Sequence, residues 1–193
     1  EITRDRFEGI KSSKLILRKA LAIEQKYNVT IDNYMEFEST IFSVIQSCIV
    51  RPHGSFSDFN VTQMLINRRI MNLLSSVKTY QDCLKLHLKG LSTDFGSACK
   101  YCRDLFKEEK EKSFSCRFSY SLRNYSQHYD FPVESISTRG ERTGEGRRNI
   151  EYSVSFVISK KTLAEDSAFE KSVLDEMPDK VNVIASLREY IES

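Results

Sequence analysis

The chain has 193 residues, 40% of them hydrophobic, and a formal net charge of +2, which predicts one core and one domain, with or without an appendage. So small a net charge does not by itself indicate a nucleic-acid or membrane partner, because binding to polyanions shows as a clustered basic face. No apolar run reaches the roughly 18 residues that span a bilayer, and residues 1–27 lack the pattern of a signal peptide, so we expect a cytoplasmic protein without a membrane partner.

The first two thirds of the chain have the apolar spacing of helices. The N-terminal helix is basic and carries four large apolar residues on one stripe: Phe7, Ile10, Leu17 and Leu21. The polar segment 28–32 is expected to interrupt it, and a second helix is expected over about residues 33–50. Pro52 and Gly54 then end that second helix, since both residue types disfavour its continuation.

The clearest predicted element is a third helix over about residues 57–89. Its apolar residues recur at alternating steps of four and three along about six turns, at Ile66, Ile70, Leu73, Val77, Tyr80, Leu84 and Leu88. A shorter helix is expected over about residues 93–112, ending in the alternating charge run KEEKEK, which is typical of a solvated helix end. The next helix covers about residues 113–129 and must have ended by Pro132.

Beyond residue 130 the apolar period changes from that of helices to that of strands. VESIST and NIEYSVSFVISK alternate polar and apolar residues, which predicts two half-buried strands joined by the glycine-rich segment RGERTGEGRRN as a hairpin. An acidic helical tail is expected over about residues 163–193, broken near Pro178. The predicted fold is therefore mainly α: a helical bundle over residues 1–130, with a β-hairpin and helical extension over residues 131–193 packed on the same domain.

The cysteines indicate reduced thiols rather than a disulfide framework, because their number is odd. They are Cys48, Cys83, Cys99, Cys102 and Cys116. Cys99 and Cys102 form a CxxC with Cys116 nearby in sequence, but tetrahedral zinc needs a fourth ligand and neither a second CxxC nor an HxxxH is present. We expect these cysteines to be small apolar residues on helix faces, with no metal and no cofactor.

In the helix over residues 113–129, the apolar residues alone account for the face that packs on the core. On a helical wheel five aromatic or aliphatic residues fall within an arc of about 80°, namely Phe114, Phe118, Leu122, Tyr125 and Tyr129. Asn124 and His128 stack on the flank of this stripe, and Arg123 points further round. These three residues are therefore available for chemistry.

Arginine and histidine are the residue types that metal-free cleavage of a phosphodiester requires. Imidazole can take or give the proton of a ribose 2′-hydroxyl or of the leaving 5′-oxygen, and guanidinium presents a fork of donors to phosphate oxygens. One helix supplies only one of each. A second copy would complete an acid and base pair, which predicts a site at a homodimer interface.

The segment RNYSQH, late in a helical bundle, resembles the R-polar-x3-H signature of the HEPN superfamily (higher eukaryotes and prokaryotes nucleotide-binding domains). The resemblance covers roughly residues 1–130. It implies a metal-independent endoribonuclease in which His128 is the general acid or base, Arg123 binds the phosphate and the transition state, and Asn124 orients the histidine. Members paired with nucleotidyltransferases commonly have a tyrosine two residues after the histidine; here that position is Asp130, so the resemblance does not extend to such a partner.

The predicted hairpin carries four arginines: Arg139, Arg142, Arg147 and Arg148. Its glycines allow the backbone to approach a phosphate, so these arginines could bind RNA beside the active site. The segment lacks the GK[ST] of a nucleotide P-loop. A mobile hairpin tip with solvated charges is the alternative interpretation.

Two functions from different classes follow from the sequence. The first is a ribonuclease with a toxin or antiviral defence role, for which a neutralising antitoxin or additional domains are expected by family analogy. The second is a non-catalytic HEPN-like module that binds nucleotides or a protein partner, for which an exposed edge strand would be a docking surface. For Arg123 and His128 the structural alternative is a surface ion pair and a histidine at the helix C-terminus.

Overall fold

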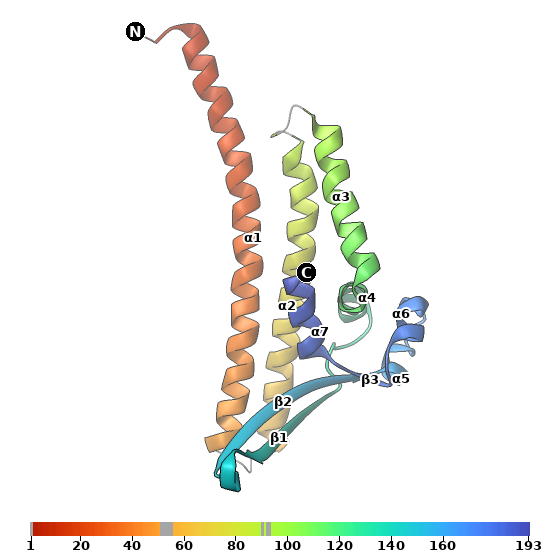
Figure 1. Ribbon diagram of the computed structural model, residues 1–193. Coiled ribbons are helices and arrows are strands. Elements are labelled where there is room, and N and C mark those ends of the chain that lie inside the picture. The colour runs from red at the N-terminus through yellow and green to blue at the C-terminus, as the bar shows by residue number, and fades with distance from the viewer. Residues whose placement is uncertain (1, 51–55, 90, 92–93) are drawn as a thin grey trace.

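The computed structural model describes residues 2–50, 56–89, 91 and 94–193 (Figure 1). It is mainly helical with one small antiparallel sheet, as expected. In chain order the elements are α1 (Arg4–Val50), α2 (Phe56–Leu88), α3 (Phe95–Lys112), α4 (Phe114–His128), β1 (Ser135–Thr143), the 3-10 turn η1 (Glu145–Arg147), β2 (Asn149–Ser159), α5 (Lys160–Leu163), α6 (Lys171–Glu176), β3 (Lys180–Asn182) and α7 (Val183–Glu192). Among the described helices, none has an apolar stretch that would cross a membrane.

The two longest helices, α1 and α2, lie side by side and antiparallel (Figure 1). Their shared seam buries residues at near-heptad spacing on both helices: Thr30, Phe37, Ile41 and Val44 on α1, and Ile66, Ile70, Leu73 and Val77 on α2. Further along, the rings of Tyr27 and Tyr80 meet edge to face at 5.8 Å. N-terminal to this seam, residues 2–18 are all exposed, because α1 continues beyond the end of α2.

The expected break at residues 28–32 is wrong, because α1 is one continuous helix through this segment. The polar side chains that favour turns here bond instead to the helix backbone: Thr30 Oγ1 donates to the carbonyl of Lys26 at 3.2 Å, and Asn33 Nδ2 to that of Val29 at 2.8 Å. Thr30 is also buried in the seam. Packing against α2 therefore overrides the local preference of these residues.

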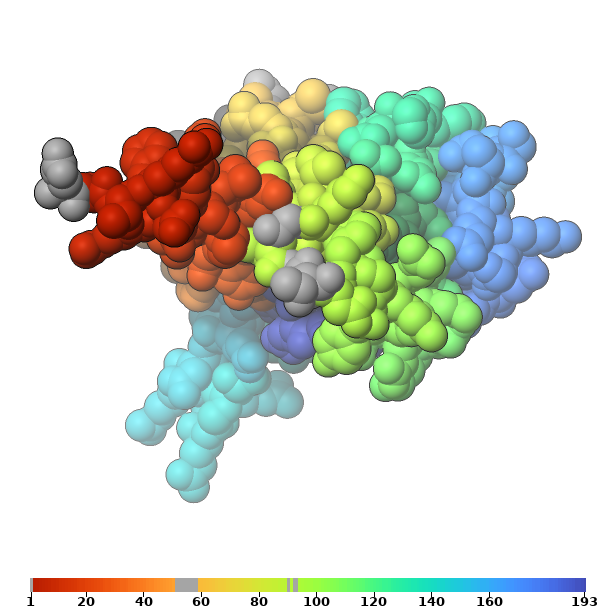
Figure 2. Space-filling view, turned by 90° about the horizontal axis from the view of Figure 1, so that it is seen from above, coloured from red at the N-terminus to blue at the C-terminus, as the bar shows by residue number. Residues whose placement is uncertain are grey.

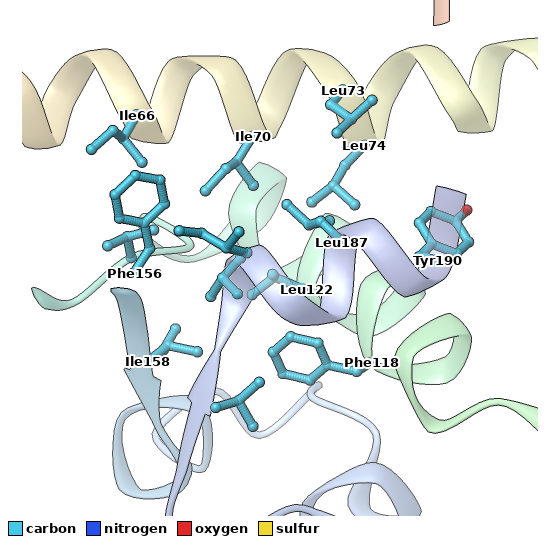
Figure 3. Close-up of a cluster of buried hydrophobic side chains, with 14 of the residues drawn as sticks. Ile66, Ile70, Leu73, Leu74, Phe118, Leu122, Phe156, Ile158, Leu187 and Tyr190 are labelled. Atoms are coloured by element: carbon cyan, nitrogen blue, oxygen red, sulfur yellow. The ribbon is translucent and has the colours of Figure 1, made fainter. Parts of the chain in front are cut away.

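The main core forms where α2, α4, α7 and β2 converge (Figure 3). It contains Ile66 and Ile70 of α2, Phe118 and Leu122 of α4, Phe156 and Ile158 of β2, and Leu187 of α7, all below 1% exposed. The segment after residue 131 thus supplies side chains to the same core as the helical bundle. Tyr129, expected on the buried stripe of α4, is 51% exposed, because the helix ends at His128 and Tyr129 is its C-cap.

The sheet has the strand order β1-β2-β3. In the hairpin Ile136 pairs with Phe156 and Gly140 with Tyr152, and the predicted alternation on β2 buries Val154, Phe156 and Ile158. The connection between β1 and β2 is shorter than predicted. The first part of the segment RGERTGEGRRN belongs to β1, and the chain turns within residues 144–148. Strand β3 was not expected; it lies inside the predicted helical tail and pairs with the end of β2.

Hydrogen bonds from α2 fix the chain as it leaves α4. The backbone N–H of Val133 donates to Oδ1 of Asn67 at 3.0 Å, and Gln63 Nε2 donates to the carbonyls of Val133 and Glu134 at 3.1 and 3.0 Å. Asn67 is 1% exposed. Its side chain therefore supplies the hydrogen-bond acceptor that water cannot supply to the buried Val133 N–H. These contacts set where α4 ends and where β1 begins.

Replacing Asn67 with leucine should lower the free energy of unfolding by about 2 kcal/mol, because the Val133 N–H would be left buried and unsatisfied. Urea denaturation of the Asn67→Leu variant measures this. Asn72→Leu, an exposed position on the same helix, is the matched control and should change stability by less than about 0.5 kcal/mol. Equal effects at the two positions would contradict a specific role for the buried bond.

The ion pair between Glu38 and Arg188 joins α1 to α7, with two N–O distances of 2.7 Å. Hydrogen bonds from Arg188 hold the pKa of Glu38 below its ordinary value. A lowered pKa means that the pair stabilises the fold above the ordinary glutamate range and that this stability is lost as the pH falls through the folded-state pKa.

Glu38→Gln should therefore cost up to about 1 kcal/mol at neutral pH, a modest value because the pair is partly solvated. The difference from the parent protein should shrink as the pH is lowered below about 4. Thermal unfolding across a pH series checks both statements. Glu145→Gln, on the exposed hairpin, serves as the control; a Glu38→Gln effect that grows in acid would refute the assignment.

Candidate functional site

Helix α4 carries all three residues that the motif singles out. Its N-cap is Ser113, whose side chain accepts a hydrogen bond from the Cys116 N–H. Asn124 and His128 are exposed and Arg123 is half-buried. Arg123 Nη1 donates to Oδ1 of Asn124 at 3.1 Å, while its Nε is buried and has no hydrogen-bond partner among the described residues.

The arrangement of the three side chains follows from the helix geometry. Arg123 and His128 leave α4 about 140° apart, whereas Asn124 and His128 are only about 40° apart. The bond from Arg123 to Asn124 shows that the guanidinium reaches round the helix toward the exposed flank. Asn124 therefore links the cation to the side of α4 that carries the imidazole.

The structural alternative for Arg123 was a surface ion pair, and among the described residues no carboxylate pairs with it. Its bonded partner is the neutral Asn124. Arg117, one and a half turns earlier, behaves differently: its guanidinium binds Glu176 at 2.6 Å and also donates to the carbonyls of Lys110 and Glu111. Of the two arginines on α4, Arg117 ties helices together and Arg123 retains donors for another group.

His128 is the last residue of α4. Within the described part of the chain its imidazole has no hydrogen bond or ion pair. The neighbouring Gln127, which the sequence did not single out, donates to Ser75 Oγ of α2 at 3.2 Å and so fixes the end of the helix. The backbone thus holds the histidine in place, while its imidazole nitrogens have no partner among the described residues.

Tyr125, the buried aromatic residue between Asn124 and His128, was predicted only as a core residue. Its hydroxyl is buried without a hydrogen-bond partner among the described residues, and burial raises its pKa to about 12. The ring packs edge to face on Phe169, 6.1 Å away. Tyr125 therefore stays a neutral phenol that supports the helix rather than a titrating group.

All four hairpin arginines are exposed, and Arg139 is in addition ion-paired with Glu141 of the same strand. Arg147 and Arg148 lie at the tip, which projects from the rest of the molecule (Figure 2). The nine residues of β1 separate this tip from the end of α4 by about 30 Å at the usual strand rise. Within one chain, the structure does not bring the tip arginines beside His128.

A groove of about 920 Å³ lies between the end of α1, the start of α2 and strand β1. Its walls mix apolar and hydroxyl side chains with one arginine, and include Phe59, Thr62, Leu65, Ile136, Arg139 and Tyr152. Arg123, Asn124 and His128 do not line it. The motif on α4 therefore lies on an open surface, and the groove is a separate feature.

The described residues contain no group of three His, Cys, Asp or Glu side chains that could hold a metal ion. Cys99 and Cys102 are half-buried on α3 and Cys116 is buried on α4. Burial raises the pKa of the Cys116 thiol, which disfavours the thiolate that metal binding needs.

Comparison of the chain with known protein families, with curated proteins and with solved structures finds no match. The resemblance to HEPN domains therefore rests on the segment RNYSQH and on its place near the end of a helix in a mainly helical fold.

The exposure of the motif predicts that it contributes little to stability. Asn124→Ala and His128→Ala should each change the free energy of unfolding by less than about 0.5 kcal/mol. Leu122→Ala, on the buried face of the same helix, should cost about 3 kcal/mol. Denaturant unfolding of the three variants checks this contrast, and a large loss from His128→Ala would make the histidine a structural residue.

Proposed function

We propose that the protein is a metal-independent endoribonuclease of HEPN type, with its active site completed by a second copy of the chain. The observation that carries this proposal is the arrangement on α4. The Arg123 guanidinium is bonded to Asn124 rather than to a carboxylate, and His128 is exposed one turn further along.

In this mechanism His128 takes the proton of the ribose 2′-hydroxyl as that oxygen attacks the adjacent phosphorus. Arg123 donates to the phosphate oxygens on which negative charge builds. Breaking the bond to the 5′-oxygen leaves a 2′,3′-cyclic phosphate, and a second acid must protonate the leaving oxygen. Since one chain offers one histidine on α4, His128 of a second chain is the acid in a two-fold site.

The biological role proposed is that of a toxin or antiviral defence enzyme that cleaves cellular RNA. A ribonuclease of this kind would damage the RNA of its own cell unless restrained, so a neutralising antitoxin or further domains belong to the same proposal. Arg147 and Arg148 would bind the RNA at a distance from the cleaved bond, since they lie at the hairpin tip.

A non-catalytic binding module is the second candidate, and the groove beside β1 favours it. The outer edge of β1 has no strand partner among the described residues, and β1 residues line the groove. An extended peptide could add to such an edge by backbone hydrogen bonds. In that case Arg123 and His128 would be dispensable for the protein's activity.

The decisive experiment incubates the purified protein with total RNA in excess EDTA and analyses the fragment ends. We expect cleavage that survives chelation and leaves 2′,3′-cyclic phosphates. His128→Ala should reduce the rate by about 100-fold or more, as loss of a general acid or base does. His87→Ala, which removes a histidine from the end of α2, is the matched control and should cleave like the parent protein.

Two further results decide between the candidates. The specific activity of the parent should rise with protein concentration, because the site needs two chains. If the folded parent leaves RNA intact at every concentration, or if His128→Ala cleaves as fast as His87→Ala, the ribonuclease proposal fails and the binding module replaces it.

A further inference from the structure

The side of α1 that faces away from α2 carries a long row of exposed apolar side chains. Seven large residues are each more than half exposed: Phe7, Ile10, Leu17, Leu21, Met35, Phe42 and Ile49. On a helical wheel they fall within an arc of about 120°, opposite the buried arc that contains Phe37 and Ile41. We call these seven residues the α1 stripe.

The spacing of the α1 stripe is that of a coiled-coil seam. Steps of seven residues connect Phe7 to Ile49 through Leu21, Met35 and Phe42, with polar residues at the two intermediate positions. A stripe that keeps a seven-residue repeat over so many turns is suited to a second helix, because a narrow seam of this period meets only another helix along its length. Scattered surface apolar residues would show no such period.

Charge is distributed unevenly along the same helix. Residues 4–26 contain seven Lys or Arg against three Asp or Glu, whereas residues 27–50 contain three carboxylates and no Lys or Arg. Glu36 and Glu38 of the second half are ion-paired with Arg69 and Arg188, and Asp32 is exposed. Two copies of α1 in parallel would place one basic half against the other, while antiparallel copies place each basic half against an uncharged or acidic one.

We infer that the α1 stripe is a self-association surface on which a second copy of this chain pairs its own α1 in antiparallel orientation. The occupant is a second copy because the helix is self-complementary in this orientation only. Asn28 lies midway between Phe7 and Ile49 in sequence and on the exposed flank. With the two-fold axis at Asn28, Leu21 approaches the partner's Met35, and the two Asn28 amides meet as a polar pair that fixes the register.

This surface is independent of the proposed ribonuclease site. Figure 1 shows α1 on one side of α2, and α3 and α4 on the other. Pairing through α1 therefore neither covers nor completes the face that carries Arg123 and His128. The test below measures mass and cross-linking, so its failure is distinguishable from the failure of RNA cleavage.

Light scattering or sedimentation of the double variant Leu21→Asp/Met35→Asp tests the pairing. We expect the parent to associate and the double variant to have half the parent's mass. The dissociation constant of the α1 pairing should rise on the order of tenfold or more, since each substitution acts twice in a two-fold interface. The control is Val61→Asp/Leu86→Asp, which places the same charges at exposed apolar positions of α2 and should keep the parent's mass. A monomeric parent, or equal masses for both double variants, overturns the inference and leaves the stripe to a different partner.

Cross-linking with a short bis-maleimide tests the orientation, with the parent's own cysteines as the background. Asn28→Cys should give a strong additional dimer band, because the two copies of this position meet at the axis. Ile10→Cys should add none, because antiparallel pairing places the two copies of residue 10 at opposite ends of the helix pair. Dimer bands from both variants would show parallel pairing and refute the charge argument, and circular dichroism confirms that each variant is folded.

Discussion

The seam between α1 and α2 is the contact on which the rest of the fold depends. It holds together two helices of 47 and 33 residues, whose stability in a protein comes mainly from the packing of their apolar faces rather than from intrinsic helix propensity. The same α2 residues that close the seam, Ile66, Ile70 and Leu73, also reach the core formed with α4, α7 and β2. A loss of register in the seam would therefore displace every element that packs on α2.

The C-terminal segment decides which face of α4 stays open. Glu189 of α7 accepts from Ser115, Glu176 binds Arg117, and Glu170 accepts from Ser121 at 3.4 Å. These contacts engage polar residues in the first half of α4. In the last turn and a half of α4, Tyr125 is buried against Phe169, and only the face that carries Asn124 and His128 stays exposed. The segment beyond residue 131 thus shapes the candidate site although it contributes none of its three residues.

The sequence predicted the fold wherever one apolar period persisted. The bounds of α2, α3 and α4 agree within about two residues, and the hairpin followed from alternation through Phe156. The predicted break at residues 28–32 is wrong because the side chains of Thr30 and Asn33 bond to backbone carbonyls of the same helix, which packs against α2. Strand β3 was missed because three residues are too few to show an alternating pattern. For the site, the motif identifies Arg123 and Asn124 but does not predict the bond between them, because that bond depends on side-chain rotamers that residue spacing does not specify.

The two proposed contacts with a second chain, through the α4 face and through the α1 stripe, lie on opposite sides of α2. The symmetry of the two contacts limits which assemblies they can form together. In the proposed ribonuclease the α4 face needs a second copy, because one chain has a single imidazole there; the inferred pairing of the α1 stripe rests instead on its exposed apolar residues. Each contact is self-complementary and so implies its own two-fold axis. If the two axes cross at right angles, the product is a closed tetramer, whereas axes that do not intersect produce an open chain of subunits. In the closed form the number of α4 faces is fixed, whereas in the open chain it grows with each added subunit.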